Sequence, residues 1–424
     1  MRDRMSSDRR AAAGVPQGPP AAPHGARASG RRPRVFQVCA IEATVHVLLL
    51  PQLRALEAAG YEVECVSSPG SWGPRVWADG LVIHRVPILR RVAPWADLKA
   101  LVRLVGLLRR GRADVVHTHT PKAALLGQVA ARLAGVPVRF NTVHGLYFYS
   151  VHHPLKRWLF KQIEVAACRS CTHVFSQSRE DADFLAGEGH IPAARVEYIG
   201  NGINLSNFDP GAYGPEVRRA VRRELAIPQG AFVVGFVGRL VREKGLLELL
   251  EAFACLRREA PEAYLLVVGP MDRSRGLEVE PHHADRLGVG PGCRFLGFRD
   301  DMPRLYAAMD VSCLPSHREG YPRTVMEACA MGLPCVVTDI RGSREAVVDG
   351  VNGLRVPVQD APALAAALGR LHRDAALRRR LGEHARRRAV EAFDEQRYIR
   401  TVVDRYRRIV PPPGAADQAL AGAP

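Results

Sequence analysis

Short apolar segments alternate with longer helical stretches along most of this 424-residue sequence, and no other feature constrains the fold as strongly. Such alternation is typical of doubly wound parallel sheets, in which a helix connects each strand to the next. The pattern therefore predicts an α/β chain. We expect strands at 35–39, 62–66, 82–86, 114–117, 138–143, 173–176 and 196–199, and in a second run at 232–237, 264–268, 294–296, 311–314 and 335–338.

The length of the chain indicates two domains, because a single core rarely extends beyond about 250–300 residues. Turn-forming residues at Gly200-Asn201-Gly202 and Asp209-Pro210-Gly211 suit a linker between the two runs of strands. The first residues are rich in Arg, Pro, Ala and Gly, without an apolar core of signal-peptide length. We expect a disordered basic tail at 1–33, an N-terminal domain at 34–205, a C-terminal domain at 206–393, a last helix at 394–410 and a tail at 411–424.

The composition narrows the class of protein. Hydrophobic residues make up 47% of the chain, yet no stretch approaches the ~20 apolar residues of a membrane-spanning helix. The nine cysteines mostly lie in apolar strands or helices without paired spacing, which indicates a reducing, cytoplasmic environment. Cys168-x-x-Cys171 could be half of a zinc site, but no second Cys or His pair lies at ligand spacing near it. We therefore favour buried thiols and expect neither a metal nor a cofactor.

A glycine and two cations follow the first strand of the second run, in the order strand, Gly238-Arg239, Lys244-Gly245, helix. A helix N-terminus offers free N–H groups and a partial positive charge to phosphate oxygens, and Arg239 adds a planar fork and Lys244 a point charge. Only five of the 60 basic residues are lysines, so Lys244 departs from an arginine background. A solvated cation pair is the alternative. The absence of a Gly-Lys-Ser/Thr sequence argues against a P-loop.

Two carboxylates, Glu319 and Glu327, flank the start of another expected helix. Pro322 suits its first turn, because the missing N–H of proline is not needed there. Glu327 would then lie about one turn inside the helix, while Glu319 stays on the loop. Carboxylates accept hydrogen bonds from vicinal diols, so this pair could hold a ribose and a hexose. Two unrelated surface glutamates are the alternative.

Together these motifs resemble those of the family-4 glycosyltransferases, which are retaining enzymes of GT-B architecture, with two Rossmann-like domains facing a cleft. The second half of the chain carries Gly238-Arg239 with Lys244, the Glu-x7-Glu spacing, FLGF, DVSCLPS and GLPCVVTDIRGSREAVVDGVNGL. The first half carries VVHTHTPKAALLG, NTVHGLYF, FSQSREDA and IGNGIN. The resemblance covers roughly residues 34–410 and implies that the last helix crosses back to the first domain.

The resemblance also implies roles for individual residues. Arg239 and Lys244 would bind the donor diphosphate, Glu319 the hydroxyls of the donor sugar, and Glu327 the ribose. The base would be bordered by Phe298 and Arg299. The other residues that we expect to bind the donor are Gly238, Gly320, Tyr321, Pro322, Thr324 and Val325.

Histidines end two strands of the first run, where open α/β sheets bind their ligands. His117 and His119 end one strand, and for His117 we favour a structural role. His144 lies in NTVHGLYF, at the position of the family's strand-end His-Gly near the donor sugar. We therefore expect His144 to hydrogen-bond a sugar hydroxyl beside the reacting carbon, with His119 as the second candidate.

The segment after the first strand departs from the family pattern. The family often has a glycine pair there whose backbone approaches the donor phosphates, whereas this chain reads Cys39-Ala-Ile-Glu-Ala-Thr44. Glu42 cannot make the same close backbone approach as glycine. Thr44 or its amide could substitute, and the sequence leaves this open.

The segment 146–161, LYFYSVHHPLKRWLFK, alternates aromatic and basic residues. It could lie on an anionic membrane surface with Trp158 and Phe160 at the headgroup level, or it could be an ordinary packed helix. With the arginines around Arg109 and Arg379 it favours an enzyme on the inner membrane face. The acceptor would then be a polyprenyl-linked sugar or a glycolipid.

We therefore predict a hexosyltransferase that moves a sugar from a UDP- or GDP-linked donor to an acceptor hydroxyl with retention, in cell-surface polysaccharide or glycolipid synthesis. A sugar-nucleotide 2-epimerase of similar fold is one alternative, and it would convert its substrate without an acceptor. A nucleic-acid-binding protein would explain the net charge of +17. However, no helix-turn-helix, zinc-finger or RNP signature is recognisable and aromatic residues make up only 6%, so we expect no nucleic-acid partner.

Overall fold

The computed structural model describes residues 31–70, 72–89, 91, 93–151, 153–271 and 278–413, and the described part from Arg32 onward forms one compact unit. The tails predicted at 1–33 and 411–424 lie almost entirely outside the described residues. Two sheets of seven and six strands, all paired in parallel, confirm the predicted α/β class.

The first sheet has the strand order β3-β2-β1-β4-β5-β6-β7. The order reverses between β1 and β4, and in such sheets ligands bind beyond the carboxyl ends of the strands at that point. Its strands are β1 (Arg34–Val38), β2 (Glu62–Ser67), β3 (Val82–Arg85), β4 (Val115–His119), β5 (Val138–Val143), β6 (His173–Ser176) and β7 (Val196–Tyr198). The helical segments between them are α1 (Glu42–Thr44), η1 (Val45–Leu49), α2 (Leu50–Ala58), α3 (Gly73–Ala78), α4 (Pro94–Arg110), α5 (Pro121–Leu133), η2 (Tyr147–Ser150), α6 (Pro154–Arg169), α7 (Arg179–Gly187) and η3 (Ala193–Arg195).

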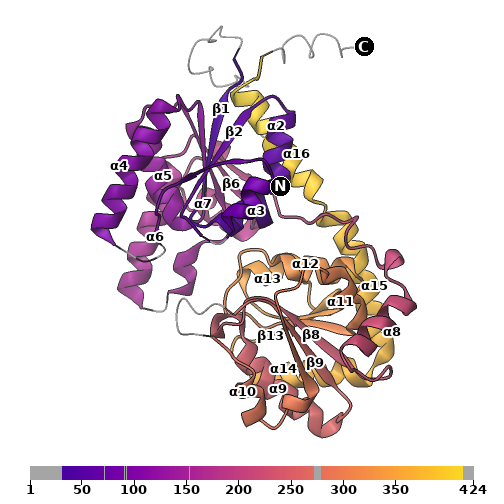
Figure 1. Cartoon of the computed structure of the whole chain (residues 1–424). Helices are drawn as coiled ribbons and strands as arrows, with labels where there is room; N and C mark the ends of the chain where they lie inside the picture. The colour runs from indigo at the N-terminus through magenta and orange to yellow at the C-terminus, as the bar shows by residue number, and fades with distance from the viewer. Residues whose placement is uncertain are drawn as a thin grey trace, which may run out of the picture. The chain divides into compact units, whose positions relative to one another are not determined.

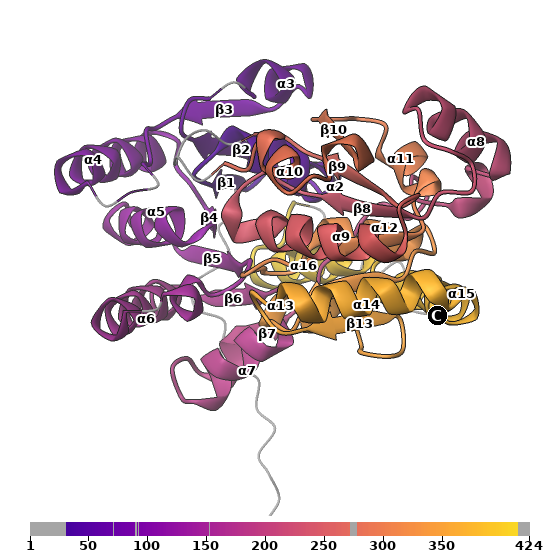
Figure 2. The same ribbon diagram turned by 90° about the horizontal axis from the view of Figure 1, so that it is seen from below.

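Helices cover both faces of the first sheet. On one face, α4 and α5 bury apolar side chains such as Leu104 against Phe36 of β1, and α6 lies beside α5 (Figures 1 and 2). On the other face, α2 packs beside α16 (Glu395–Ile409), whose Val402 and Tyr406 share a buried cluster with Phe140 of β5. The last helix of the chain therefore completes the core of the first sheet, as the resemblance implies.

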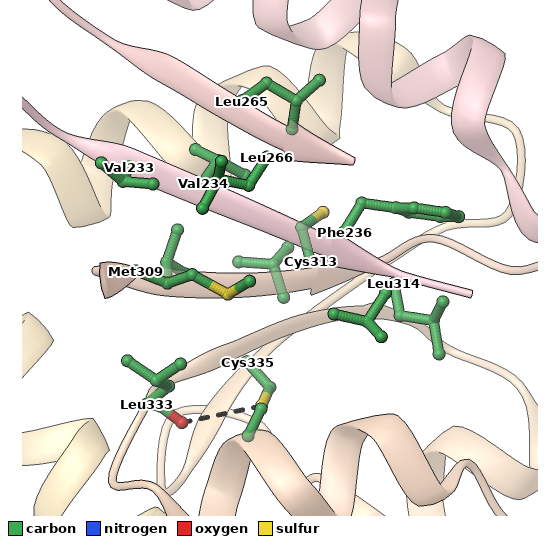
Figure 3. Close-up of a cluster of buried hydrophobic side chains, with 14 of the residues drawn as sticks. Val233, Val234, Phe236, Leu265, Leu266, Met309, Cys313, Leu314, Leu333 and Cys335 are labelled. Carbon is green, nitrogen blue, oxygen red and sulfur yellow. Dashed lines mark hydrogen bonds between the residues drawn. The ribbon is translucent and has the colours of Figure 1, made fainter. Parts of the chain in front are cut away.

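The second sheet has the order β10-β9-β8-β11-β12-β13 and reverses between β8 and β11. Its strands are nearly continuous apolar runs because helices cover them on both faces. Figure 3 shows Val234 and Phe236 of β8 packed with Leu266 of β9 and Cys313 of β11. The strands are β8 (Val233–Val237), β9 (Tyr264–Val268), β10 (Cys293–Gly297), β11 (Val311–Leu314), β12 (Cys335–Thr338) and β13 (Gly353–Val356). The helical segments are η4 (Pro210–Ala212), α8 (Pro215–Glu224), η5 (Arg242–Lys244), α9 (Leu246–Glu259), α10 (His282–Arg286), η7 (Gly290–Gly292), α11 (Met302–Ala308), α12 (Arg323–Ala330), α13 (Arg341–Ala346), α14 (Ala361–Arg373) and α15 (Ala375–Ala392).

The two chain connections between the sheets lie side by side. The N–H of Ile203 donates to the carbonyl of Phe393, and the N–H of Glu395 donates to the carbonyl of Ile203. A Cβ at Gly202 would overlap the backbone of Glu395. The domain boundaries predicted near 205 and 393 remain a prediction, but both fall close to this backbone contact.

The sequence pattern missed β13, a four-residue edge strand that pairs in parallel with β12 and carries an arginine, Arg355. Among the described residues, no helix is both long enough and apolar enough to cross a bilayer.

Candidate active site

The loop after β8 and the loop after β11 meet at one point beyond the carboxyl ends of these two strands. Gly245 ends the η5 turn at φ 71°, and a Cβ there would overlap the carbonyl oxygen of Pro315, so this position favours glycine. The ammonium of Lys244 lies 2.5 Å from Oε1 of Glu319, and the hydroxyl of Ser316 donates to the same oxygen at 2.6 Å. The structure therefore brings together a cation and a carboxylate that are 75 positions apart.

A cavity of about 310 Å³ opens at this ion pair. Arg239, Lys244, Glu319 and Gly320 line it together with His144, so five of the expected site residues share one cavity. Its other walls come from α5, β5, α6 and nearby loops, through Thr120, Pro121, Ala124, Asn141, Thr142, Val143, Gly145, Leu146, Tyr147, Glu164, Ala167, Cys168, Glu243 and Arg318.

A second cavity of about 500 Å³ adjoins the first and shares Gly145, Glu319 and Gly320 with it. Its cationic wall is already neutralised. Arg341 lies 3.0 Å from a carboxylate oxygen of Asp181 and Arg344 bonds both oxygens of Glu180. Both of these arginines therefore already have carboxylate partners.

The walls of the first cavity are held together by direct backbone contact. Gly145 has φ 116°, and a Cβ there would lie 2.7 Å from Cα of Gly320. A Cβ at Gly320 would overlap the carbonyl oxygen of His144, and one at Gly342 would overlap the carbonyl of Gly320. Gly145 and Gly320 thus allow the strand-end loop of β5 and the loop before α12 to touch without side chains between them, and Gly342 of α13 allows an equally close approach to Gly320.

The imidazole of His144 is engaged at both nitrogens. Its Nε2 lies 3.1 Å from Nδ1 of His119, and its Nδ1 lies 2.9 Å from the carboxamide of Gln177. Burial lowers the pKa of His144, and burial together with His117 and His144 lowers that of His119. Both rings are therefore neutral near pH 7. A hydrogen bond from the His144 ring to a sugar hydroxyl, as expected from the sequence, requires one of these contacts to open.

Glu327 lies on α12 and does not line the first cavity. Its Oε2 accepts a hydrogen bond from the hydroxyl of Tyr306 at 3.0 Å. Burial raises the pKa of Glu327 to about 7, although Arg323 and Tyr306 both act in the opposite direction. No side chain caps the first turn of α12, which begins directly after Pro322, so its first N–H groups are available to an anion.

Comparisons with known proteins identify the family. The family described as "Glycosyl transferases group 1" matches residues 217–388, and "Glycosyl transferase 4-like domain" matches residues 44–202. The UDP-Gal:alpha-D-GlcNAc-diphosphoundecaprenol alpha-1,3-galactosyltransferase of Escherichia coli is 30% identical over 324 residues, covering 76% of this chain and 82% of that protein. The chain belongs to the family-4 glycosyltransferases.

Two other similar proteins agree with this assignment. The N,N'-diacetylbacillosaminyl-diphospho-undecaprenol alpha-1,3-N-acetylgalactosaminyltransferase of Campylobacter jejuni is 26% identical over 369 residues, covering 84% of this chain and 95% of that protein. The crystal structure of Anabaena HepE in complex with UDP-glucose matches with a TM-score of 0.74 at 20% identity, over 88% of this chain and 99% of that one. The latter supports the GT-B fold of this glycosyltransferase.

Other expected donor-binding residues of the glycosyltransferase have different surroundings. Phe298 is 48% exposed and meets Trp72 edge-on, with ring centroids 5.8 Å apart. Arg299 is occupied by ion pairs with Asp301 and Glu224, so its guanidinium is not open to a base. Val325 and Tyr321 are buried and can contribute only through their backbone or through packing; the hydroxyl of Tyr321 donates to the carbonyl of Glu345.

The structure explains how the glycosyltransferase accommodates Glu42 in place of a glycine. Its carboxylate is buried, Oε1 accepts a hydrogen bond from Nε of Arg85 at 3.2 Å, and Gly70 and Gly73 leave room for it. The chain continues into the π-helical η1, since Pro51 lacks the N–H that a regular α-helix would use. The Glu42 side chain therefore has a structural partner and does not line the described cavity.

Two buried carboxylates that the sequence analysis missed hold the loop after His144. Glu164 accepts hydrogen bonds from the N–H groups of Tyr147 and Phe148 at 2.9 and 3.0 Å, and Asp181 accepts one from Leu146 at 3.0 Å. Burial raises the pKa of Glu164 to about 7 despite these N–H donors. The sequence signal that could have identified these carboxylates is an acidic residue on the otherwise apolar side of a predicted helix.

Proposed function

We propose that this glycosyltransferase transfers a hexose from a UDP- or GDP-linked donor to an acceptor hydroxyl with retention of anomeric configuration. The observation that carries the proposal is the convergence of Arg239, Lys244 and Glu319 on one cavity beside the β5 strand end. Two cations there can stabilise the negative charge that grows on a departing diphosphate. The uncapped N-terminus of α12 adds a partial positive charge close by in the chain.

The reaction is a substitution at the anomeric carbon. The bond from that carbon to the diphosphate oxygen breaks, and a bond to the acceptor oxygen forms on the same face. The proton of the acceptor hydroxyl passes to the departing phosphate oxygen. Glu319 accepts hydrogen bonds from the donor sugar, and because Lys244 contacts this carboxylate at 2.5 Å, donor binding is expected to rearrange the ion pair toward the phosphate.

The acceptor that we propose is a polyprenyl-diphosphate sugar or a glycolipid. Support comes from the Escherichia coli and Campylobacter jejuni relatives, whose names specify sugar-diphospho-undecaprenol acceptors. Such an acceptor places the enzyme at the inner membrane face. The synthesis of a cell-surface polysaccharide or glycolipid is the pathway type that uses it.

Two helices of the first sheet present apolar and basic side chains to solvent. On α6, Leu155 and Trp158 are 68% and 58% exposed and lie beside exposed Lys156 and Arg157. On α4, Trp95 is 80% exposed, and Leu98 and Val102 continue the same helical face between exposed Lys99 and Arg103. We propose that these faces lie on anionic lipid, with the aromatic rings at headgroup depth.

Vesicle sedimentation checks the membrane proposal. Binding to vesicles with anionic lipid should fall as salt rises, because attraction between exposed charges is screened beyond about 8–10 Å at physiological ionic strength. Replacing Lys156, Arg157 and Lys161 together by Ser should weaken vesicle binding and leave donor binding unchanged. The matched control replaces three exposed arginines elsewhere by Ser, Arg219 and Arg223 of α8 and Arg258 of α9. An equal loss of vesicle binding in both triple variants would show that only the net charge matters. That result would contradict a specific role of the α6 surface.

The affinity for the donor should depend on pH through the ionisation of the Glu327 carboxyl group. Its pKa of about 7 leaves the carboxyl mostly protonated at pH 6, and only the carboxylate accepts hydrogen bonds from both ribose hydroxyls with both oxygens. Affinity should therefore rise by about tenfold from pH 6 to pH 8, following the ionised fraction. Titration calorimetry with an intact sugar nucleotide measures this, because a free nucleoside diphosphate has its own phosphate pKa near about 6. The Glu327→Gln variant should bind more weakly with a flat profile; a parallel rise in that variant would contradict the ribose role.

Donor binding itself is tested by thermal stabilisation with a panel of UDP- and GDP-sugars. One nucleotide class should raise the Tm strongly, since a ligand at 100 times its Kd stabilises the native state by about 2.7 kcal/mol. The Arg239→Ala variant should lose this shift. No stabilisation by any sugar nucleotide would contradict the proposed function.

A further inference from the structure

The second cavity, of about 500 Å³, is used by no step of the reaction proposed above. Its volume falls within the range of small-molecule sites, roughly 300–1,000 Å³. It lies where the loop after His144 meets the loop between β12 and α13, and it shares Glu319 with the first cavity. A ligand in the second cavity would therefore meet a donor sugar that is bound at Glu319.

Two arginines of this cavity are stacked on tyrosine rings of η2. The guanidinium carbon of Arg341 lies 3.9 Å from the ring centroid of Tyr149, and that of Arg318 lies 4.8 Å from the ring centroid of Tyr147. All four residues line the cavity. Stacking occupies the face of a guanidinium and leaves its N–H edge for hydrogen bonds. Among the residues that the structure describes, Arg318 has no acceptor within hydrogen-bond distance, because the carboxylate of Glu243 lies 3.8 Å away.

The charges around the cavity are close to balance, since three arginines and four carboxylates line it. The arginines are Arg318, Arg341 and Arg344, and the carboxylates are those of Asp181, Glu243, Glu319 and Asp339. A diphosphate would meet more negative than positive side chains there, which opposes its binding. Hydroxyl groups both donate and accept hydrogen bonds, so a wall of guanidinium donors and carboxylate acceptors suits an uncharged sugar.

The edge of the cavity continues to the surface of α6. Tyr149 and Ser150 of η2 line the cavity, and α6 begins shortly after them at Pro154. The guanidinium carbon of Arg157, which is exposed on α6, lies 5.8 Å from the ring centroid of Tyr149. The Tyr149 ring thus contacts Arg341 of the cavity and Arg157 of the α6 surface. A sugar carried by a lipid would reach the second cavity from this side.

We propose that the second cavity binds the uncharged sugar ring of the acceptor, with the reacting hydroxyl at the Glu319 edge. Arg318 and Arg341 donate hydrogen bonds to hydroxyl oxygens of this ring, and the hydroxyl of Tyr149 adds a further contact. The diphosphate that follows the sugar in a polyprenyl-linked acceptor then lies outside the cavity, toward α6. This assignment rests on the proposed function, because it takes the acceptor to be a lipid-linked sugar.

Arg341→Lys tests the assignment, because lysine keeps the charge beside Asp181 and loses the planar fork. The acceptor is chosen as the best substrate from a panel of short-chain prenyl-diphosphate sugars. The acceptor KM should rise by about tenfold, with the donor KM unchanged. Tyr149→Phe, which keeps the ring against Arg341, should raise the acceptor KM by about two- to tenfold, the range for one hydrogen bond. An unchanged acceptor KM in both variants, or an equal rise in the donor KM, would overturn the proposal.

The matched control is Glu180→Gln. Glu180 bonds Arg344 and lies 3.6 Å from Arg341, but it does not line the cavity. This variant removes one negative charge from the contact between α7 and α13, and the acceptor KM should stay within about twofold, because an uncharged sugar does not respond to that charge. A clear fall in the acceptor KM would indicate a bound diphosphate. A rise equal to that of Arg341→Lys would show that only the contact between the two helices matters. Either result contradicts the assignment.

Binding without donor separates this proposal from the proposed function. Calorimetric titration of the parent and of Arg341→Lys compares the chosen prenyl-diphosphate sugar with the same prenyl diphosphate lacking the sugar. The parent should bind the sugar-bearing compound more tightly, and Arg341→Lys should lose most of this advantage while it binds the sugar-free compound as the parent does. An equal loss for both compounds, or no advantage of the sugar in the parent, would refute the proposal. A parent that shows the expected binding pattern but no transfer would contradict the proposed function alone.

Discussion

Replacing Lys244 or Arg239 by alanine should lower kcat/KM by roughly 30- to 1000-fold. Both residues line the cavity at the junction of the two loops, and both would face charge that grows on the departing diphosphate. Removing one preorganised electrostatic donor typically removes about 2–4 kcal/mol of transition-state stabilisation. Steady-state assays of nucleoside diphosphate release measure the effect.

The matched control for this prediction is Arg242→Ala. Arg242 lies on the same η5 turn but is exposed, and it does not line the cavity. Its loss should change kcat/KM by no more than a few-fold, since exposed charges contribute little. If Lys244→Ala and Arg239→Ala both retained parental turnover, the diphosphate assignment would be wrong.

Gly320→Ala should lower kcat by about 100-fold while the protein remains folded. A Cβ at this position would overlap the carbonyl oxygen of His144, so the two loops that line the cavity must move apart. A misplacement of about 1 Å near the reacting groups can reduce the rate by about 10²-fold. Glu319 and His144 would be displaced together, because Glu319 directly precedes Gly320 and His144 directly precedes Gly145.

Gly187→Ala is the control for the glycine contact. Gly187 ends α7, is exposed, and a Cβ there would meet no atom within 4 Å. That variant should keep the parental kcat. Calorimetric unfolding of both variants separates folding from activity. Full activity in a folded Gly320→Ala protein would show that the close approach of the loops is unnecessary.

Most of the fold was predictable because parallel strands buried on both faces leave a strong local signal. The apolar runs at β8, β9 and β11 are of this kind, and their predicted positions agree with the structure to within a residue or two. β13 was missed because it is short, lies at the sheet edge and carries Arg355, so its apolar pattern is weak. The crossover of α16 came from the resemblance, since local pattern cannot say which sheet a terminal helix covers.

The candidate site was predictable only where chemistry is concentrated in short motifs. Lys244 and Glu319 stand out because each lies in a recognisable loop, and the structure places them in contact. The glycine contact between Gly145 and Gly320 joins residues 175 positions apart and has no local signal. The buried contacts of the Tyr406 hydroxyl with Gln37 of β1 and His117 of β4 have no local signal either, because they join the last helix to strands from the first half of the chain. Arg299 shows the opposite case, since its motif position suggests a ligand contact and the fold provides two carboxylates instead.

A transfer assay with a labelled donor and a lipid-linked acceptor decides between glycosyl transfer and the alternatives. The purified protein is incubated with a radiolabelled UDP- or GDP-sugar, with and without a polyprenyl-diphosphate sugar in mixed micelles. Nucleoside diphosphate should be released only when the acceptor is present, and the label should move into the lipid-extractable product in equal amount. The new linkage should keep the anomeric configuration of the donor. Conversion of the sugar nucleotide without any acceptor would indicate an epimerase, and together with the absence of label in the lipid product it would contradict the glycosyl-transfer mechanism proposed for this site.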